Sequence, residues 1–392
     1  MATAHHVWVT TNRRGNNDIL EDDVVKLSKI LAGSACALLA LAAVGDAAAE
    51  PMEIKMTTTW PPGINLIEAD KHFVETVNQI ADGKLKINFY PGDTLVPSTQ
   101  VFDAASSGTV DAAADWPGYW AGQDSTFALL GSFPMLLTAG DYILWLQQWG
   151  GFEAFQKVYG KFDMVYLPYS VLTMESGLRS GEPLASLEDH KGKRLRMSGR
   201  PQGEILKELG AAQVQLPGSE VYQALERGVV SGAEFSAPAV DWGMGFQEVT
   251  EHWTTPGWHQ PGSVGGVMIN KKVWDEMGPE LQNLLKIAAN ATMTWSLAYY
   301  EKGSTEATAK FKEAGVEVHR LSDEEMERLQ RIANEQLVKA ACDNPLYAEI
   351  AYSQVQFMQE YADWRDLQGE FAFGRNPSSL PDAAKIKSCI EN

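Results

Sequence analysis

The sequence predicts an α/β protein of two lobes, with a ligand cleft between them and long helices at its C-terminal end. Three observations predict this class: the chain has 392 residues, its first folded segment reads as strand, helix and strand, and one short pattern occurs twice. A chain of this length is too long for a single ordinary core. Two similar α/β lobes would account for the repeat.

The strand–helix–strand unit opens the folded part of the chain. EIKMTTTW (53–60) has the apolar spacing of a strand, and NLIEADKHFVETVNQIADG (65–83) has that of an amphipathic helix ending at Gly83. KLKINFYPG (84–92) alternates apolar and polar residues, as a half-buried strand does.

The repeated pattern is FDAASSGTVDAA at 102–113 and YQALERGVVSGA at 222–233. Each copy predicts the end of a helix, a glycine cap at Gly108 or Gly228, and a short strand. Ligands of α/β proteins bind outside the carboxyl ends of strands, so we expect the residues after each copy to face the cleft. These residues are Trp116, Tyr119 and Trp120 after the first copy, and Glu234 and Phe235 after the second.

The C-terminal third has helical apolar spacing at 274–315 and at 322–341, where Ser322 and Glu325 form a capping signal. We predict this division of the chain: an N-terminal extension with a signal peptide at 1–49, lobe I at 50–175 and 263–303, and lobe II with the C-terminal helices at 176–262 and 304–392.

The N-terminal segment has the three parts of a secretory signal peptide. Lys26 and Lys29 precede an apolar run at 30–44, and small residues follow it. Acidic residues stand before these lysines, so we expect translation to begin at Val25. The mature protein is therefore predicted to be periplasmic. Its two cysteines, Cys342 and Cys389, either form a disulfide there or remain separate thiols.

The charge of the chain excludes some partners. It carries 32 Lys and Arg against 51 Asp and Glu, a net charge of −19. Nucleic acids and anionic membranes bind chiefly to positive surfaces, so neither is expected as a partner. The sequence also lacks the common fingerprints of metalloproteases, α/β-hydrolases and nucleotide-binding enzymes.

The segment GKRLRMSG (192–199) predicts a strand that ends in a glycine turn, with Arg194 and Arg196 on one strand face. From the residues alone, such an arginine is either a surface charge or a clamp for an anionic ligand. A planar guanidinium offers a carboxylate two parallel hydrogen bonds, which suits the second role.

Four motifs together resemble the solute-binding proteins of the tripartite ATP-independent periplasmic (TRAP) transporters. They are GDTLVPSTQVFDAASSGTVDAA, LEDHKGKRLRMSG, ELGAAQVQLPGSEVYQALERGVVSGAEF and VMINKKVWDEM, and the resemblance extends over residues 53–373. It implies a periplasmic-binding-protein-like fold that closes on an organic anion and delivers it to a membrane permease. It also implies that Arg196 grips the substrate carboxylate.

Within this family, GAEF followed by APAVDW and TTPGWHQPG resembles the branch that binds 2-oxo or 2-hydroxy acids, often with a metal ion. That branch has a glutamate and then an aromatic residue where Glu234 and Phe235 stand. Its other two polar positions, a glutamine and a glutamate, are occupied here by Glu175 and Gln260. The two residue types are thus exchanged between these positions.

Charge balance favours a bound cation. Glu234, Glu175 and a substrate carboxylate carry three negative charges, and Arg196 returns only one positive charge. Like charges ~4 Å apart repel by about 4 kcal/mol at an effective dielectric constant of ~20. A Na⁺ or Ca²⁺ ion held by oxygen atoms of Glu234, Glu175, Gln260 and the backbone near Phe235 would restore the balance. A protonated Glu175, or Arg179 as a second cation, would do the same. No organic cofactor is expected.

Aromatic side chains are expected to wall the cleft and to limit the size of the ligand: Trp60, Tyr119, Trp120, Phe235 and Trp258. His259 has no partner that the sequence reveals, and we expect a structural role for it.

The sequence therefore predicts a periplasmic receptor and not an enzyme. Its expected partners are a small organic monoacid, the permease subunits and a second copy of the chain, bound through the C-terminal helices. One alternative is the same fold binding an aromatic or larger carboxylate without a metal. Another is a secreted hydrolase that uses Glu175 and Glu234 as an acid/base pair.

Overall fold

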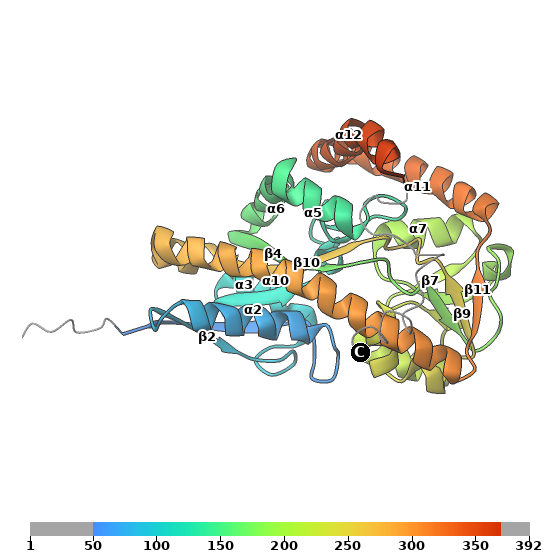
Figure 1. The fold of residues 1–392 in the computed structure, drawn as a ribbon, viewed down its shortest axis with the longest axis horizontal. Helices are drawn as coiled ribbons and strands as arrows, with labels where there is room; N and C mark the ends of the chain where they lie inside the picture. The colour runs from blue at the N-terminus through green and yellow to red at the C-terminus, as the bar shows by residue number, and fades with distance from the viewer. Residues whose placement is uncertain (1–49, 370–392) are drawn as a thin grey trace, which may run out of the picture. The chain divides into compact units, whose positions relative to one another are not determined.

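The computed structural model describes residues 50–369 (Figure 1). The predicted signal peptide, the start at Val25 and Cys389 lie outside these residues, while Cys342 is exposed on its helix. The described chain forms two sheets with helices on their faces, which confirms the predicted two-lobe α/β class. Among the helices of residues 50–369, none combines the length and apolar character needed to cross a membrane.

The first sheet has the strand order β2-β1-β3-β10-β4. Strands β1, β2 and β3 are parallel, and β10 is antiparallel to both β3 and β4. The bounds are β1 Met52–Thr58, β2 Leu85–Phe89, β3 Ala112–Asp115, β4 Met164–Leu172 and β10 Ser263–Asn270. Helix α2 (Ile67–Ile80) lies between β1 and β2 in the chain and buries Phe73 and Val77 in the same core as Ile54 of β1. The predicted strand–helix–strand opening is confirmed.

The second sheet has the strand order β11-β9-β5-β8-β6-β7. The bounds are β5 Leu178–Ser180, β6 Arg194–Arg196, β7 Ala212–Val214, β8 Gly232–Ala233, β9 His252–Thr255 and β11 Glu317–Arg320. Strand β5 is antiparallel to its neighbours β8 and β9, and the other neighbouring pairs are parallel. The helices of this part are α7 (Arg200–Glu208), α8 (Gly218–Glu226) and α9 (Pro238–Gly243).

The two copies of the repeat have the same local structure in different sheets. Helix α3 (Val101–Ser107) precedes β3, and helix α8 precedes β8. After each helix a glycine takes a left-handed conformation, Gly108 with φ 78° and Gly228 with φ 64°. In both copies the two residues after that glycine donate their backbone N–H groups to one carbonyl, that of Ala104 or Ala224. The predicted helix, cap and strand are therefore confirmed in each copy.

The long helix α10 (Lys271–Glu313) runs from the first sheet to the second (Figure 1). It covers the predicted helix 274–315 except for its last two residues, and it is kinked at Gly278, whose φ of 68° lies outside the helical region, just before Pro279. Helix α11 (Asp323–Asp343) begins with the predicted capping box, because Ser322 and Glu325 each accept the other's backbone N–H.

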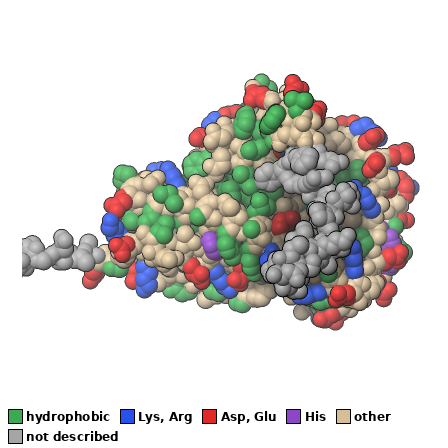
Figure 2. Space-filling view, in the orientation of Figure 1, with side chains coloured by type: hydrophobic (Ala, Val, Ile, Leu, Met, Phe, Trp, Pro, Cys, Tyr) green, Lys and Arg blue, Asp and Glu red, His purple; other side chains and the backbone are tan. Residues whose placement is uncertain are grey.

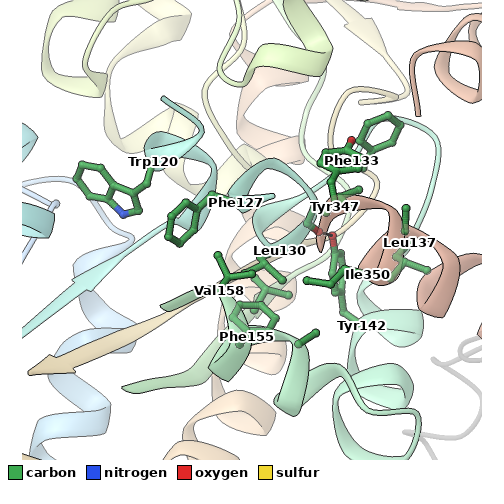
Figure 3. Close-up of a cluster of buried hydrophobic side chains, with 14 of the residues drawn as sticks. Trp120, Phe127, Leu130, Phe133, Leu137, Tyr142, Phe155, Val158, Tyr347 and Ile350 are labelled. Atoms are coloured by element: carbon green, nitrogen blue, oxygen red, sulfur yellow. Dashed lines mark hydrogen bonds between the residues drawn. The ribbon is translucent and has the colours of Figure 1, made fainter. Parts of the chain in front are cut away.

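A last helix, α12 (Pro345–Gln368), has no counterpart among the predicted elements. It packs against α4 (Phe127–Gly131), α5 (Ala139–Gln148) and α6 (Gly151–Tyr159). Its Tyr347 and Ile350 join the main hydrophobic core beside Tyr142 of α5 (Figure 3). Helix α11 packs against both α12 and α7. The predicted lobe boundaries stay a prediction.

Candidate functional site

A cavity of about 40 Å³ is lined by residues at the carboxyl ends of β3 and β8. Asp115 ends β3 and Trp116 follows it, while Phe235 and Ser236 follow β8. The residues that follow the two copies of the repeat therefore line one cavity. This agrees with the rule that α/β proteins bind ligands outside the carboxyl ends of their strands.

Five of the predicted site residues line this cavity: Trp60, Tyr119, Glu175, Phe235 and Gln260. Trp60 and Tyr119 meet edge to face, with ring centroids 5.9 Å apart. Tyr119 also reaches solvent, since 37% of its surface is exposed. Trp116 lines the cavity as well and contacts Tyr119 through a similar edge-to-face pair at 5.1 Å.

Trp120 and Trp258 have core positions. Both belong to the main hydrophobic cluster, in which the rings of Trp120 and Phe102 are in contact. Figure 3 shows Trp120 near Phe127. The indole N–H of Trp120 donates to Asp115. A direct contact of these two tryptophans with a ligand stays a prediction.

Arg196 and Glu234 lie behind the cavity wall and are almost completely buried. Strands β6 and β8 are parallel neighbours, with Arg196 opposite Ala233, so the residue after Ala233 is placed beside the arginine. Arg196 Nη1 donates to Glu234 Oε1 at 2.9 Å and to the Glu234 carbonyl at 2.6 Å. The backbone N–H of Ser198 also donates to Glu234 Oε1. The two predicted residues therefore form a buried ion pair.

The guanidinium of Arg196 makes further contacts within the protein. Its Nε and Nη2 donate to the carbonyl of Leu216 at 3.3 and 3.1 Å, and its carbon lies 5.3 Å from the ring centre of Phe235. These bonds fix the plane of the guanidinium at the cavity wall. Its predicted role as a carboxylate clamp stays a prediction.

His259 joins the two glutamates, a contact that the sequence did not reveal. Its Nε2 lies 3.0 Å from Glu175 Oε2 and 3.6 Å from Glu234 Oε2, and all three side chains are buried. The loop that carries His259 is held to the loop of Glu175, whose N–H donates to the Gln260 carbonyl at 3.1 Å. Basic and acidic side chains therefore alternate in the order Arg196, Glu234, His259 and Glu175.

This order determines how the pKa values shift. Burial raises the pKa of Glu175 to about 8, although His259 opposes the rise. Burial would also raise the pKa of Glu234, but Arg196 and His259 lower it to about 2. Burial lowers the pKa of His259, whereas the two glutamates raise it to about 9. The imidazolium of His259 thus supplies a positive charge that the charge count from sequence omitted.

Arg179 cannot be the extra cation of the cavity, because it already has a counter-ion. It is fully buried, its Nε lies 3.2 Å from Asp241 Oδ2, and its guanidinium stacks on Trp253 and Phe311 at 3.9 Å from each ring centre.

The oxygen atoms around His259 fit a hard cation. Glu234 Oε2 and Gln260 Oε1 are buried and have no hydrogen-bond partner among the described residues. Glu175 and Glu234 can each direct one carboxylate oxygen to a common point, since the ligand atoms of this cluster lie within 4.8 Å of one another. His259 can bind an ion only after losing its proton. Carboxylate and amide oxygens are the ligands that Ca²⁺ prefers.

The opposite side of the cavity carries two buried aspartates that the sequence did not reveal as site residues. Asp70 accepts hydrogen bonds from Thr58 at 2.6 Å and Tyr169 at 2.5 Å, and Asp115 accepts one from Tyr159 at 2.8 Å. Burial raises the pKa of each aspartate to about 7, against the effect of these hydrogen bonds. The repeat could have revealed Asp115, because it stands two positions after the first copy, as Phe235 stands two positions after the second.

The comparisons with known proteins identify the family of the chain. Residues 56–343 match the DctP family, described as bacterial extracellular solute-binding protein, family 7. The chain belongs to this family. A DctP-family protein is a solute-binding receptor, so the chain is not an enzyme, and the hydrolase alternative for Glu175 and Glu234 falls away.

A curated relative and two solved structures resemble this DctP-family chain. A monocarboxylate 2-oxoacid-binding periplasmic protein of Nostoc sp. is 30% identical over 325 residues, which cover 82% of this chain and 85% of the relative. A TRAP transporter solute-binding protein of Bordetella bronchiseptica, with calcium and picolinate, has a TM-score of 0.78 and 25% identity, covering 87% of this chain and 99% of that one. One of Colwellia psychrerythraea, with calcium and pyruvate, has a TM-score of 0.77 and 26% identity, covering 81% and 97%.

Proposed function

We propose that this protein captures a small 2-oxo or 2-hydroxy monoacid together with a calcium or sodium ion and delivers the acid to a TRAP permease. The observation that carries the proposal is the buried array of Arg196, Glu234, His259 and Glu175 behind a small cavity. The Nostoc relative is named for binding 2-oxoacids, and the Colwellia structure holds calcium with pyruvate.

Each residue of the array has a separate task in this proposal. Arg196 offers positive charge and N–H donors to the substrate carboxylate, in a water-poor setting that strengthens the attraction. Glu234, Glu175, Gln260 and the backbone near Phe235 would hold the cation, whose charge would draw the acid into the cavity. Trp60, Tyr119 and Phe235 limit the length of the side chain that the cavity admits.

The wider biology is also part of the proposal. Residues 1–49 direct export and are removed, and the lobes divide after residues 175, 262 and 303. Two copies associate through the C-terminal helices, which expose the apolar side chains of Val338, Tyr352, Trp364 and Leu367. The Bordetella structure is described as a dimer, which agrees with such a pairing. The face drawn in Figure 2 mixes acidic with basic side chains, as expected of a receptor for small solutes rather than polyanions.

Ligand binding by the purified protein tests the proposal. After unfolding, dialysis against chelator and refolding, the protein is titrated calorimetrically with pyruvate, lactate, malonate and picolinate, each with Ca²⁺, with Na⁺ or with neither. We expect saturable binding of one monoacid per chain, tightened at least tenfold by one of the two ions. Equal affinity with and without ions would contradict the cation, and binding of none of the 2-oxo or 2-hydroxy acids would contradict the ligand class.

A second ligand class has one observation in its favour. Trp116 extends the aromatic wall formed by Trp60, Tyr119 and Phe235, and the Bordetella structure holds picolinate, an aromatic acid. If picolinate binds and pyruvate and lactate do not, the protein is a receptor for aromatic acids.

A further inference from the structure

We propose that His252, Glu317 and His319 form a binding site for a divalent transition-metal ion of the zinc class. The three residues lie on β9 and β11, at the outer edge of the second sheet and apart from the residues of the cavity. In the orientation of Figure 1, where β9 and β11 form the right-hand edge, Figure 2 shows histidine among acidic side chains at the surface.

The pairing of the two strands brings these side chains together. Strands β9 and β11 are parallel, with Glu317 opposite His252. Side chains two positions apart on a strand point to the same face, so His319 joins Glu317 on the face that His252 shares. Trp253 and Val318, one position along each strand, occupy the other face, where Trp253 packs on Phe311 and Arg179.

The ligand atoms have the spacing of a metal site. His252 Nδ1 lies 3.0 Å from His319 Nε2 and 3.5 Å from Glu317 Oε2, and all three atoms lie within 4.8 Å of one another. Zinc binds histidine nitrogen and carboxylate oxygen at ~2.0–2.1 Å in a tetrahedron, whose corners are then about 3.3 Å apart. The observed distances bracket that value, so an ion would enter with small movements of the side chains.

The exposure of the residues suits such an ion. The side chain of His252 is 14% exposed and that of Glu317 is 66% exposed, so the site opens to solvent on one side. Three protein ligands with an open fourth position are the usual set for zinc with a bound water molecule. Two imidazoles favour zinc, copper or nickel over calcium and sodium, which prefer oxygen ligands alone.

The ion would link the edge strand β11 to its neighbour β9. Strand β11 pairs with β9 and with no other strand among the described residues. A metal bridging His252 to Glu317 and His319 adds a second link to the backbone pairing of these two strands. Because the unfolded chain lacks this arrangement, the ion would stabilise the folded protein.

The test is zinc binding by residues 50–392 without a histidine tag, which also removes His5 and His6. The chelator-treated protein is titrated with ZnCl₂ by calorimetry, and its thermal unfolding is followed with and without the ion. We expect one site of micromolar or tighter affinity and a rise in the unfolding temperature. His319→Gln, His252→Gln and the exposed Glu317→Gln should each weaken that affinity at least tenfold.

Two controls separate this site from others. His72→Gln alters a histidine that stacks on Trp295 elsewhere and should leave zinc affinity unchanged. Glu234→Gln alters the cavity and should also retain the zinc site, while His319→Gln should retain organic-acid binding. The proposal is overturned if zinc neither binds nor stabilises the protein. It is also overturned if Glu234→Gln removes zinc binding while the His252, Glu317 and His319 variants keep it.

Discussion

The two sides of the cavity each bury a pair of carboxylates, but with opposite kinds of partner. On the second sheet, Glu234 pairs with Arg196, and His259 lies between Glu234 and Glu175. On the side of the first sheet, Asp70 of α2 and Asp115 of β3 accept hydrogen bonds only from neutral hydroxyl and indole groups among the described residues. The repeat gives both sides the same helix, cap and strand, so the difference comes from the residues at and beyond the strand ends.

The partners determine what each pair can do. A carboxylate beside a guanidinium stays ionised, and the pKa of Glu234 is lowered to about 2. Such a group can hold a cation at neutral pH. A buried carboxylate whose partners are all neutral is hard to ionise, because nothing compensates for the loss of water. Its pKa therefore rises, to about 7 for Asp115. We infer that Glu234 with Arg196 supplies fixed charge beside the ligand, whereas Asp70 and Asp115, like Glu175, gain or lose a proton near neutral pH.

The largest effect is expected from Arg196→Ala, which removes the cation of the charged side. Losing one member of a buried charge pair costs about 2–5 kcal/mol of binding, a weakening of roughly 30-fold to several thousandfold. Calorimetry with the best acid of the panel measures it, and circular dichroism verifies folding. Arg194→Ala is the matched control, since Arg194 lies exposed on the same strand. Affinity within threefold of the unchanged protein would refute the clamp.

A smaller loss is expected from Glu234→Gln, which keeps the shape of the side chain and removes its charge. A hydrogen bond to a charged group contributes about 1.5–3 kcal/mol, so binding should weaken roughly 10-fold to 100-fold. The dependence on Ca²⁺ or Na⁺ should disappear with it. The exposed Glu226→Gln, at the end of α8, should change neither property. If ligand binding by Glu234→Gln still depended on Ca²⁺ or Na⁺ as it does in the unchanged protein, Glu234 would not be a ligand of the cation.

A substitution of Asp115 should alter the stability of the protein rather than its affinity for the ligand. The pKa of Asp115 is about 7 when folded, above its unfolded value of ~3.9, so its contribution to stability is fully present below about pH 4 and lost as the pH rises to 7. Asp115→Asn cannot ionise and should flatten this decline by on the order of 1–3 kcal/mol. Thermal unfolding of the ligand-free protein at several pH values measures it.

The control for this variant is Asp103→Asn, an exposed aspartate on α3. An Asp115→Asn variant whose stability falls with pH as steeply as that of the unchanged protein would show that Asp115 is ionised throughout. The distinction between the two sides of the cavity would then fail.

The sequence could predict what depends on local pattern. The repeat predicted the glycine caps, the short strands and the common cavity; after β8, Phe235 lines that cavity and Glu234 lies behind its wall. Parallel pairing of β6 with β8 then brings Arg196 beside it, which no local pattern shows.

The remaining site residues depend on contacts between distant segments. His259 meets Glu175 across 84 positions of the chain, and Asp70 meets Tyr169 across 99. In sequence, Asp70 looks like any polar position of an amphipathic helix. Tryptophans are ambiguous for a related reason: Trp60 lines the cavity and Trp258 packs in the core, although both stand beside proline and glycine turns.

The smallest effect concerns the feature that the two sides share. Gly108 and Gly228 have positive φ, which costs other residues about 1–2 kcal/mol. An added Cβ would meet only the side chain of Asn270 in the first case, with Nδ2 at 3.5 Å, and nothing within 4 Å in the second. Gly108→Ala and Gly228→Ala should therefore lower the free energy of unfolding by similar amounts, near ~1 kcal/mol. Denaturant titration measures both, and unequal losses would show that the two copies share sequence but not the same cap energetics.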